Sequence, residues 1–302
     1  MVTLTGTGNP TTVAADRMVA LRQRIEELEG RIARGERFSR PSEDPPAHAR
    51  AAALSRLDAR LQAEQRVVER ATARLNAADT ALAEGVDVLV RARELAILGA
   101  SGTFSDADRA VIAVEVRGLK ERLVQAANRR DEAGRFLFAG AADAQPAFAP
   151  DEAGVVRYLG FGTGHGAEAA GLVGAAVPPG PAVFGPDDAG AFAALDALLA
   201  ALAEPDGELR AEAFAVAMGR VEAAHDRIVV ARAGLGVVLG RLEAEVERIA
   251  SGRIELARGL AATQGLDLAA AITELETLRL TLAATQEVFR RVAGESLFDR
   301  LG

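Results

Sequence analysis

The chain contains no cysteine and no tryptophan, and Tyr158 is its single tyrosine. The absence of cysteine excludes disulfide bonds, thiolate nucleophiles and zinc sites built on thiolates. It does not fix the compartment, because a chain without thiols is equally safe inside and outside the cell. Aromatic residues make up only 4% of the 302 residues, whereas 49% are hydrophobic. The apolar interior must therefore be built from Ala, Leu and Val, which suits slender seams between helices.

Long apolar runs and basic stripes are also missing. No run reaches the roughly 18 apolar residues of a membrane-spanning helix, so we expect no membrane partner. The first residues, MVTLTGTGNPTTVAADR, lack the basic and apolar segments of a cleavable secretory signal. The net charge is −8, and no basic stripe with interleaved aromatics occurs. We therefore expect no nucleic-acid partner.

What the chain does have is helical periodicity. Apolar residues recur at spacings of three and four over long stretches, which predicts amphipathic helices. The seams run over residues 18–32, 54–92, 112–126, 214–260 and 271–292. Alternation sustained over so many turns is typical of coiled-coil packing.

Several residues mark where these helices begin. Asp44 followed by Pro45 is an N-cap followed by a proline at the first helical position. Ser105, with Asp108 three residues later, predicts a capping box in an acidic version. A last helix should open near Asp267. The loop at residues 99–104 is short, so the helices on either side of it should be antiparallel neighbours.

The middle of the chain differs from both halves. Residues 140–190 are rich in Gly, Pro and Ala and hold one alternating run, GVVRYLGF, that predicts a strand. The sequence thus predicts a mainly α fold: a long antiparallel helical coiled-coil stem built from both chain halves, with a small β-containing insert. We expect terminal assembly helices at 1–44 and 265–302, a stem at 45–139 and 191–264, and the insert at 140–190.

Candidate chemistry is sparse. The only resemblance to a phosphate loop is Gly162, Gly164 and Ala167, in a G-x-G-x-x-A pattern after the expected strand. A flexible turn explains it better, because the following segment has too many glycines and prolines for a helix; a nucleotide-binding enzyme is the alternative. His48, His165 and His225 lie too far apart to form a metal site. The carboxylates interleave with Arg as on solvated faces. We expect no enzyme, no cofactor and no metal.

The terminal helices carry the main physical argument. An isolated helix of this length is marginal in water, so each needs a partner to bury its apolar stripe. The end helices can pair only with each other or with another subunit, and apolar stripes at both ends favour assembly. The expected assembly interface consists of Met18, Leu21, Ile25, Leu28, Ile32, Leu275, Leu278, Leu282, Phe289, Val292, Leu297 and Phe298.

Three stretches of the sequence are distinctive in combination: GERFSRPSEDPPAHARAAAL (35–54), RARELAILGASGTFSDADRAVIAVEVRGLKERLVQAANRRDEAGRFLFAG (91–140) and LDLAAAITELETLRLTLAATQEVFRRVAGESLFDRL (266–301). Together they resemble the bacterial flagellin-like proteins, and within them the hook-associated protein 3 group at the hook–filament junction. The endings GRFLFAG and SLFDRL are similar to those of the junction group. The start, MVTLTGTGNPTTVAADRM, departs from the family's Met-Arg-Ile-Ser beginning.

The resemblance implies a structural subunit that joins hook to filament and is exported through the flagellar type III apparatus. Its partners would be other copies of itself, a neighbouring hook-associated protein, flagellin and a cytoplasmic export chaperone at the C-terminal helix. It would be located in the extracellular flagellum and serve motility. A flagellin-type filament subunit is the alternative.

Overall fold

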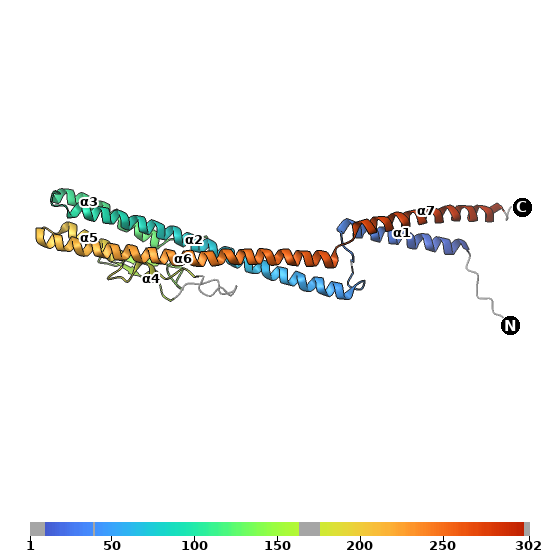
Figure 1. The fold of residues 1–302 in the computed structure, drawn as a ribbon, viewed down its shortest axis with the longest axis horizontal. Coiled ribbons are helices and arrows are strands. Elements are labelled where there is room, and N and C mark those ends of the chain that lie inside the picture. The colour runs from blue at the N-terminus through green and yellow to red at the C-terminus, as the bar shows by residue number, and fades with distance from the viewer. Residues whose placement is uncertain (1–9, 39, 163–175, 299–302) are drawn as a thin grey trace. The chain divides into compact units, whose positions relative to one another are not determined.

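A computed structural model describes residues 10–38, 40–162 and 176–298 (Figure 1), with the side chains of residues 10–11 and 292–298 left aside. Among them, helices form most of the structure. The elements are α1 (Pro10–Arg34), α2 (Pro45–Ala100), α3 (Asp106–Ala127), β1 (Phe148–Pro150), β2 (Val156–Tyr158), α4 (Gly180–Phe184), α5 (Ala191–Ala203), α6 (Gly207–Gln264) and α7 (Leu268–Phe298). The predicted fold class, a helical stem with a small β-containing insert, is confirmed.

The chain divides into two compact units, each of which is described by itself. The central unit comprises residues 61–251, and the terminal unit comprises residues 1–60 and 252–302. Helices α2 and α6 contribute to both units, so each unit contains segments from both halves of the chain.

A seam between α2 and α6 forms the axis of the central unit. Large apolar residues recur every seven positions on both helices, and each is at most 2% exposed. This spacing is the signature of coiled-coil packing, in which each side chain inserts between residues of the facing helix. The residues are Val68, Leu75, Leu82 and Leu89 on α2, and Phe214, Val221, Ile228, Leu235, Leu242 and Ile249 on α6.

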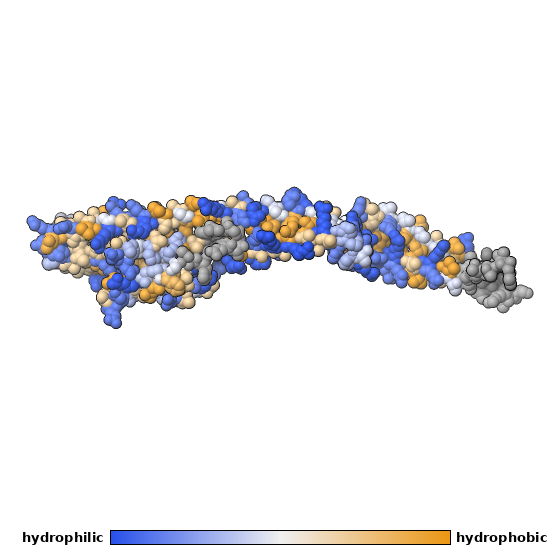
Figure 2. All heavy atoms as spheres, turned by 90° about the horizontal axis from the view of Figure 1, so that it is seen from below, coloured by the Kyte–Doolittle hydropathy of each residue, from blue (hydrophilic) through white to orange (hydrophobic). Residues whose placement is uncertain are grey.

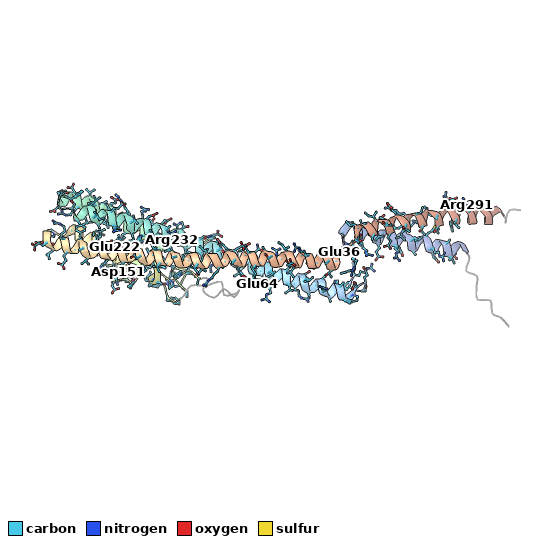
Figure 3. All side chains as sticks on the ribbon, viewed as in Figure 1. Glu36, Glu64, Asp151, Glu222, Arg232 and Arg291 are labelled. Atoms are coloured by element: carbon cyan, nitrogen blue, oxygen red, sulfur yellow. The ribbon has the colours of Figure 1, made fainter. Side chains whose placement is uncertain are left out.

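Ion pairs along the flanks of the seam fix the direction of the two helices. Arg93 of α2 pairs with Glu222 of α6 at 2.9 Å, and Glu64 of α2 pairs with Arg248 at 3.3 Å (Figure 3). The residue number of the paired side chains falls from 93 to 64 along α2 while it rises from 222 to 248 along α6, so the two helices are antiparallel. Arg232 of α6 donates from Nε and Nη2 to the two carboxylate oxygens of Asp79 of α2, at 2.9 and 3.1 Å.

Glycines allow close approach at two points of this core. A Cβ built on Gly85 of α2 would lie 3.3 Å from Ile228 of α6 and 3.5 Å from Leu123 of α3. The three helices therefore meet at Gly85. At Gly99, near the end of α2, a Cβ would lie 2.8 Å from Leu202 and 2.9 Å from Phe214.

The expected helix starts are confirmed. The backbone N–H of Ala47 donates to Asp44 at 3.0 Å, and the N–H of Ala270 donates to Asp267 at 3.1 Å. Ser105 and Asp108 form the expected reciprocal capping box at the start of α3. These side chains satisfy N–H groups that have no partner within the helix.

The insert is held to the helices by aromatic rings and by side-chain hydrogen bonds. Phe148 of β1 lies opposite Tyr158 of β2 in an antiparallel pair, so the expected strand is confirmed at residues 156–158. The Phe148 ring contacts Phe184 at 5.5 Å and Phe192 at 5.0 Å between centroids, in the tilted geometries that aromatic pairs favour. Asn128, at the end of α3, donates to the Phe148 carbonyl and accepts from its N–H.

The tetrapeptide Asp-Glu-Ala-Gly occurs twice and forms the same turn each time. Asp131 and Asp151 each accept, through one side-chain oxygen, the N–H groups two and four residues later. Gly134 and Gly154 adopt φ values of 77° and 79°, a region that glycine enters without strain. The carbonyl of Gly154 accepts a hydrogen bond from Lys120, the only lysine of the chain, which also pairs with Asp196 of α5 at 2.6 Å.

The two kinds of glycine environment predict opposite effects of the same substitution. Gly99→Ala should lower the free energy of unfolding by about 1–3 kcal/mol, because its methyl group overlaps Leu202 and Phe214. Gly118→Ala in α3 should raise it by about 1 kcal/mol, because nothing lies within 4 Å and alanine favours the helix. Urea unfolding followed by circular dichroism measures both. Equal effects of the two substitutions would contradict this packing.

The capping box predicts a shifted titration. Hydrogen bonds from the Ser105 side chain and backbone hold the pKa of Asp108 below its ordinary value. The stabilisation is present above the unfolded-state pKa and is lost as the pH falls through the lower folded-state pKa. Ser105→Ala should raise the pKa of Asp108, measured by NMR titration. The pKa of Asp151, lowered by its hydrogen bond from Arg157, serves as the control and should stay unchanged.

Candidate assembly surface on the terminal helices

The two connectors of the terminal unit bring α1 and α7 together. Gly35 ends α1 with φ 71°, and residues after it run antiparallel to the link between α6 and α7. The N–H of Arg37 donates to the carbonyl of Gln264 at 2.7 Å, and the N–H of Leu266 donates to the carbonyl of Gly35 at 3.0 Å. We call this pair of hydrogen bonds the connector bridge. It places the end of α1 beside the start of α7.

From the bridge onward, α1 and α7 pack side by side and antiparallel (Figure 1). Ile25, Leu28 and Ala271 are buried between them, at 8%, 4% and 4% exposure. Burying a Leu or Ile side chain contributes about 1.5–3 kcal/mol. Ordering each residue of the backbone costs about 1–2 kcal/mol. So few buried side chains leave the helix pair with little net stability of its own.

The other residues of the expected interface lie at the margin of this pair. Their side chains are half-buried where the structure describes them, so the smaller part of each still faces solvent. The half-buried residues are Met18, Leu21, Ile32, Leu275, Leu278, Leu282 and Phe289. The side chains of Val292, Leu297 and Phe298 lie outside the described residues.

Helix α7 also carries apolar side chains that the expected stripe did not include. Leu280 is 73% exposed and Val288 is 60% exposed, and Leu268 and Ile272 are about half exposed on another side of the helix. Apolar (orange) residues remain on the surface of the helix pair in Figure 2. A helix that is apolar on several sides is normally enclosed by neighbours. The α1 helix covers only one of these sides.

A ladder of threonines adds to this exposed surface. Thr273, Thr277, Thr281 and Thr285 each donate their hydroxyl to the carbonyl four residues earlier, at 2.7–2.9 Å. Because the hydroxyl hydrogens are used inside the helix, the methyl groups are the part left for outside contacts. The threonines of the ladder therefore add methyl groups to the apolar surface of α7, although threonine is a polar residue.

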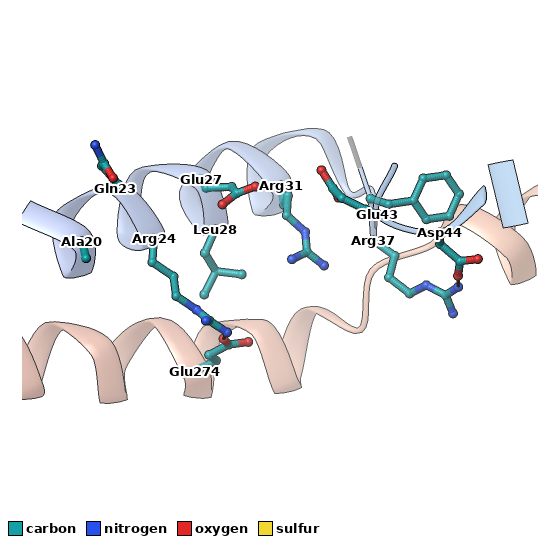
Figure 4. A pocket seen from close by; sticks show the side chains of 11 residues that line it. Ala20, Gln23, Arg24, Glu27, Leu28, Arg31, Arg37, Glu43, Asp44 and Glu274 are labelled. Carbon is teal, nitrogen blue, oxygen red and sulfur yellow. Dashed lines mark hydrogen bonds and ion pairs between the residues drawn. The ribbon is translucent and has the colours of Figure 1, made fainter. Parts of the chain in front are cut away.

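A hollow lined by charged side chains lies between α1, the connector and α7 in the terminal unit (Figure 4). This cleft has a volume of about 520 Å³. Arg24 reaches across it to Glu274 of α7 at 3.3 Å, and Arg37 pairs with Asp44 at 2.5 Å. These exposed pairs join α1 to α7 and the connector to the start of α2, and each contributes at most about 1 kcal/mol. The arrangement holds elements together and offers no nucleophile.

The other candidate residues are not brought together into a site. The rings of His48 and Phe38 lie 6.3 Å apart between centroids, and the ring of His225 forms a hydrogen bond with its neighbour Asp226 at 3.1 Å. Within the described part of the chain, no three His, Asp or Glu side chains gather as a metal site would need. Gly164, His165 and Ala167 of the candidate phosphate loop lie outside the described residues. No helix of the described ranges is long and apolar enough to cross a membrane.

Comparisons with known proteins agree with this architecture. Residues 8–143 match the family described as the bacterial flagellin N-terminal helical region. Flagellar hook-associated protein 3 of Escherichia coli K12 is 28% identical over 292 residues, covering 88% of this chain and 89% of that protein.

Solved structures share the fold. The crystal structure of Xanthomonas campestris FlgL, in space group C2, superposes with a TM-score of 0.62 at 18% identity, covering 69% of this chain and 99% of that one. Flagellar hook-associated protein 3 of Legionella pneumophila gives a TM-score of 0.62 at 16% identity, covering 70% and 98%. At such identities the likeness concerns the fold alone.

The marginal helix pair makes a prediction for the isolated chain. Limited proteolysis should remove roughly the first 40 and the last 35 residues while the central unit survives. Leu28→Asp should accelerate this trimming at least several-fold, because it places a charge in the buried line between α1 and α7. Leu280→Asp, on the exposed side, should leave the rate unchanged. Equal acceleration by both substitutions would contradict the pairing seen here.

Proposed function

We propose that the chain is a structural subunit joining the flagellar hook to the filament, because it is similar to flagellar hook-associated protein 3 and its residues 8–143 match the flagellin N-terminal helical region. The similarity to that relative runs through both chain halves. The observation that supports an assembling role most directly is α7, on which Leu280 and Val288 stay exposed and the methyl groups of the threonine ladder are left for outside contacts.

The proposed assembly interface combines two sets of residues. The half-buried residues expected from the sequence, such as Leu278 and Leu282, form its edge beside α1. The exposed residues, such as Ile272 and Leu280, form the part turned away from α1. Enclosing this surface between neighbouring subunits would add the burial that the isolated helix pair lacks. Residues 1–44 and 265–302 therefore act as assembly helices in this proposal, with the stem and insert outside them.

The route and place of the subunit follow from the same proposal. It is exported through the flagellar type III apparatus, after a cytoplasmic chaperone has held its C-terminal helix. It then assembles in the extracellular flagellum with other copies of itself, a neighbouring hook-associated protein and flagellin. Weakly held end helices suit this route, because they open at little cost and order again beside neighbours. The proposed role involves no catalysis and no cofactor.

A filament subunit of the flagellin type is the second candidate. The match of residues 8–143 to the flagellin N-terminal helical region favours it specifically, since that region is named after flagellin. The two candidates differ in self-assembly. A filament subunit forms long filaments from purified protein alone, whereas a junction subunit stops at a short structure.

The proposal predicts the phenotype of a strain that lacks the protein. Such cells should make hooks without filaments and release filament protein into the medium, as seen by electron microscopy and immunoblotting. Reintroduction of the wild-type chain should restore filaments. Normal filaments in the deletion strain would contradict the proposal.

Complementation of the same strain tests the interface. Leu280→Asp should fail to restore filaments, because a carboxylate cannot enter an apolar contact. Leu209→Asp, at an exposed position near the start of α6, serves as the matched control and should restore them. The total amount of protein outside the cell, in the medium and in flagella together, should be equal for both variants, which separates export from assembly. Filaments with Leu280→Asp would refute the assigned surface.

A further inference from the structure

Helix α6 carries a second apolar stripe that the stem does not use. Five residues recur every seven positions on its outer face, and all of them are exposed. Val230 is 70% exposed and Val237 is 60% exposed. We call these residues the outer stripe: Val216, Ala223, Val230, Val237 and Ala244.

The spacing of the outer stripe identifies the shape of its partner. It repeats with the same period as the buried stripe of α6 that faces α2, which includes Ile228 and Leu235. A seven-residue period matches a helix that crosses at a shallow angle, because only then do successive repeats keep meeting the partner. The outer stripe of α6 is thus patterned for a further helical partner, which the described residues of the single chain do not supply.

A hollow lies along one edge of the outer stripe. Val230 and Gly234 line it together with Pro178 and Ala182 of the insert, and its volume is about 510 Å³. Arg227 also lines it, and its Nη1 is buried without a hydrogen-bond partner within the described residues.

Helix α3 presents a shorter stripe of similar character. Val111 is 71% exposed and Val114 is 62% exposed, and nothing lies within 4 Å of the open side of Gly118. The buried faces of α3 and α6 point toward each other, since Leu123 and Ile228 both approach Gly85. The stripes on the reverse faces therefore lie on opposite sides of the central unit.

We propose that the outer stripe of α6 in one copy packs against the exposed stripe of α3 in the next copy. This inference rests on the proposed function for the presence of neighbouring copies. Two different faces on opposite sides of one molecule make a head-to-tail contact, which continues from copy to copy around a ring or along a helix. Stems would then touch side by side, in addition to the contacts of the terminal helices.

The two stripes complement each other when the helices run parallel. With Val114 placed level with Gly234, Gly118 lies within one residue of the level of Val237, so each valine meets the gap left by a glycine. One turn further on, Glu121 of α3 comes opposite Arg241 of α6. Both side chains are exposed, and neither forms an ion pair with a described residue in the single chain. The register thus matches shape and charge together.

Because the chain has no cysteine, introduced thiols report on the contact directly. The double variant Val111→Cys/Val230→Cys, whose positions lie within one residue of the same level in this register, is produced as the only copy in cells, and flagella are isolated and oxidised with copper phenanthroline. We expect a ladder of dimers and higher species on a non-reducing gel. Val111→Cys/Val229→Cys, whose second thiol lies a quarter-turn round α6, is the matched control and should give no ladder.

The outcomes separate this inference from the proposed function. Presence of the chain in the flagella without a ladder overturns the α6–α3 contact and leaves the junction role standing. Absence of the chain from the flagella overturns both. Dimers from Val230→Cys alone would mean that α6 pairs with α6 of another copy. A photo-crosslinking residue at position 230 that captures another protein, or residues 163–175 of the same chain, would also refute the contact.

A charge exchange tests the register. Glu121→Arg in the double-cysteine variant should abolish most of the ladder, because two arginines then face each other. Adding Arg241→Glu should restore it. Loss without restoration, in variants that are secreted at normal levels, would overturn the register.

Discussion

The structure depends on one packing constraint, the seven-residue spacing of large apolar side chains along α2 and α6. Each of these side chains is useful only if the facing helix offers a gap at the same period, so the two helices can pair over many turns in one register. The same pairing continues within the terminal unit, where Arg253 of α6 reaches Asp58 of α2 at 3.0 Å and Gly259 lies against Leu54. The start of α2 and the end of α6 consequently lie side by side, which lets the two connectors meet.

Much of this arrangement could be predicted from the sequence because it is local and periodic. Asp44, Ser105 and Asp267 mark helix starts through hydrogen bonds to residues two or three positions away, so their effect is visible in a short window. The direction of α2 against α3 follows from a short loop. The seam of α6 repeats so often that single polar interruptions, such as Arg232, do not hide it.

The features that escaped prediction are those without a period or without a sequence neighbour. The contacts of Phe148 with Phe184 and Phe192 join residues tens of positions apart, and no spacing rule points to them. The repeated turns at Asp131 and Asp151 depend on a four-residue pattern, which has no apolar period and so gives no helix or strand signal. In the candidate surface, Leu280 was missed because a stripe drawn at three-four spacing follows only one side of α7, whereas this helix is apolar on several.

The molecule therefore combines two levels of stability. The central unit has a deep core, with aromatic rings where the insert joins it and glycines where three helices meet. The terminal unit has a thin core between two helices and keeps much apolar surface outside. An exposed apolar surface of this kind promotes aggregation of an isolated protein, but it provides the contact area for a protein that is enclosed by neighbouring subunits. The exposed valines of α6 and α3 extend the same logic to the central unit.

The connector bridge sets the direction in which the terminal helices α1 and α7 pair and separate. Its hydrogen bonds pin the end of α1 to the start of α7, so pairing of the two helices is nucleated there and propagates like a zipper toward the chain ends. Fraying must then begin at the far turns, around Val13 and Val288, and advance inward. A neighbouring molecule would therefore meet the distal turns of α1 and α7 in their open state first. It would insert between the two helices turn by turn, while the connector bridge keeps them in register.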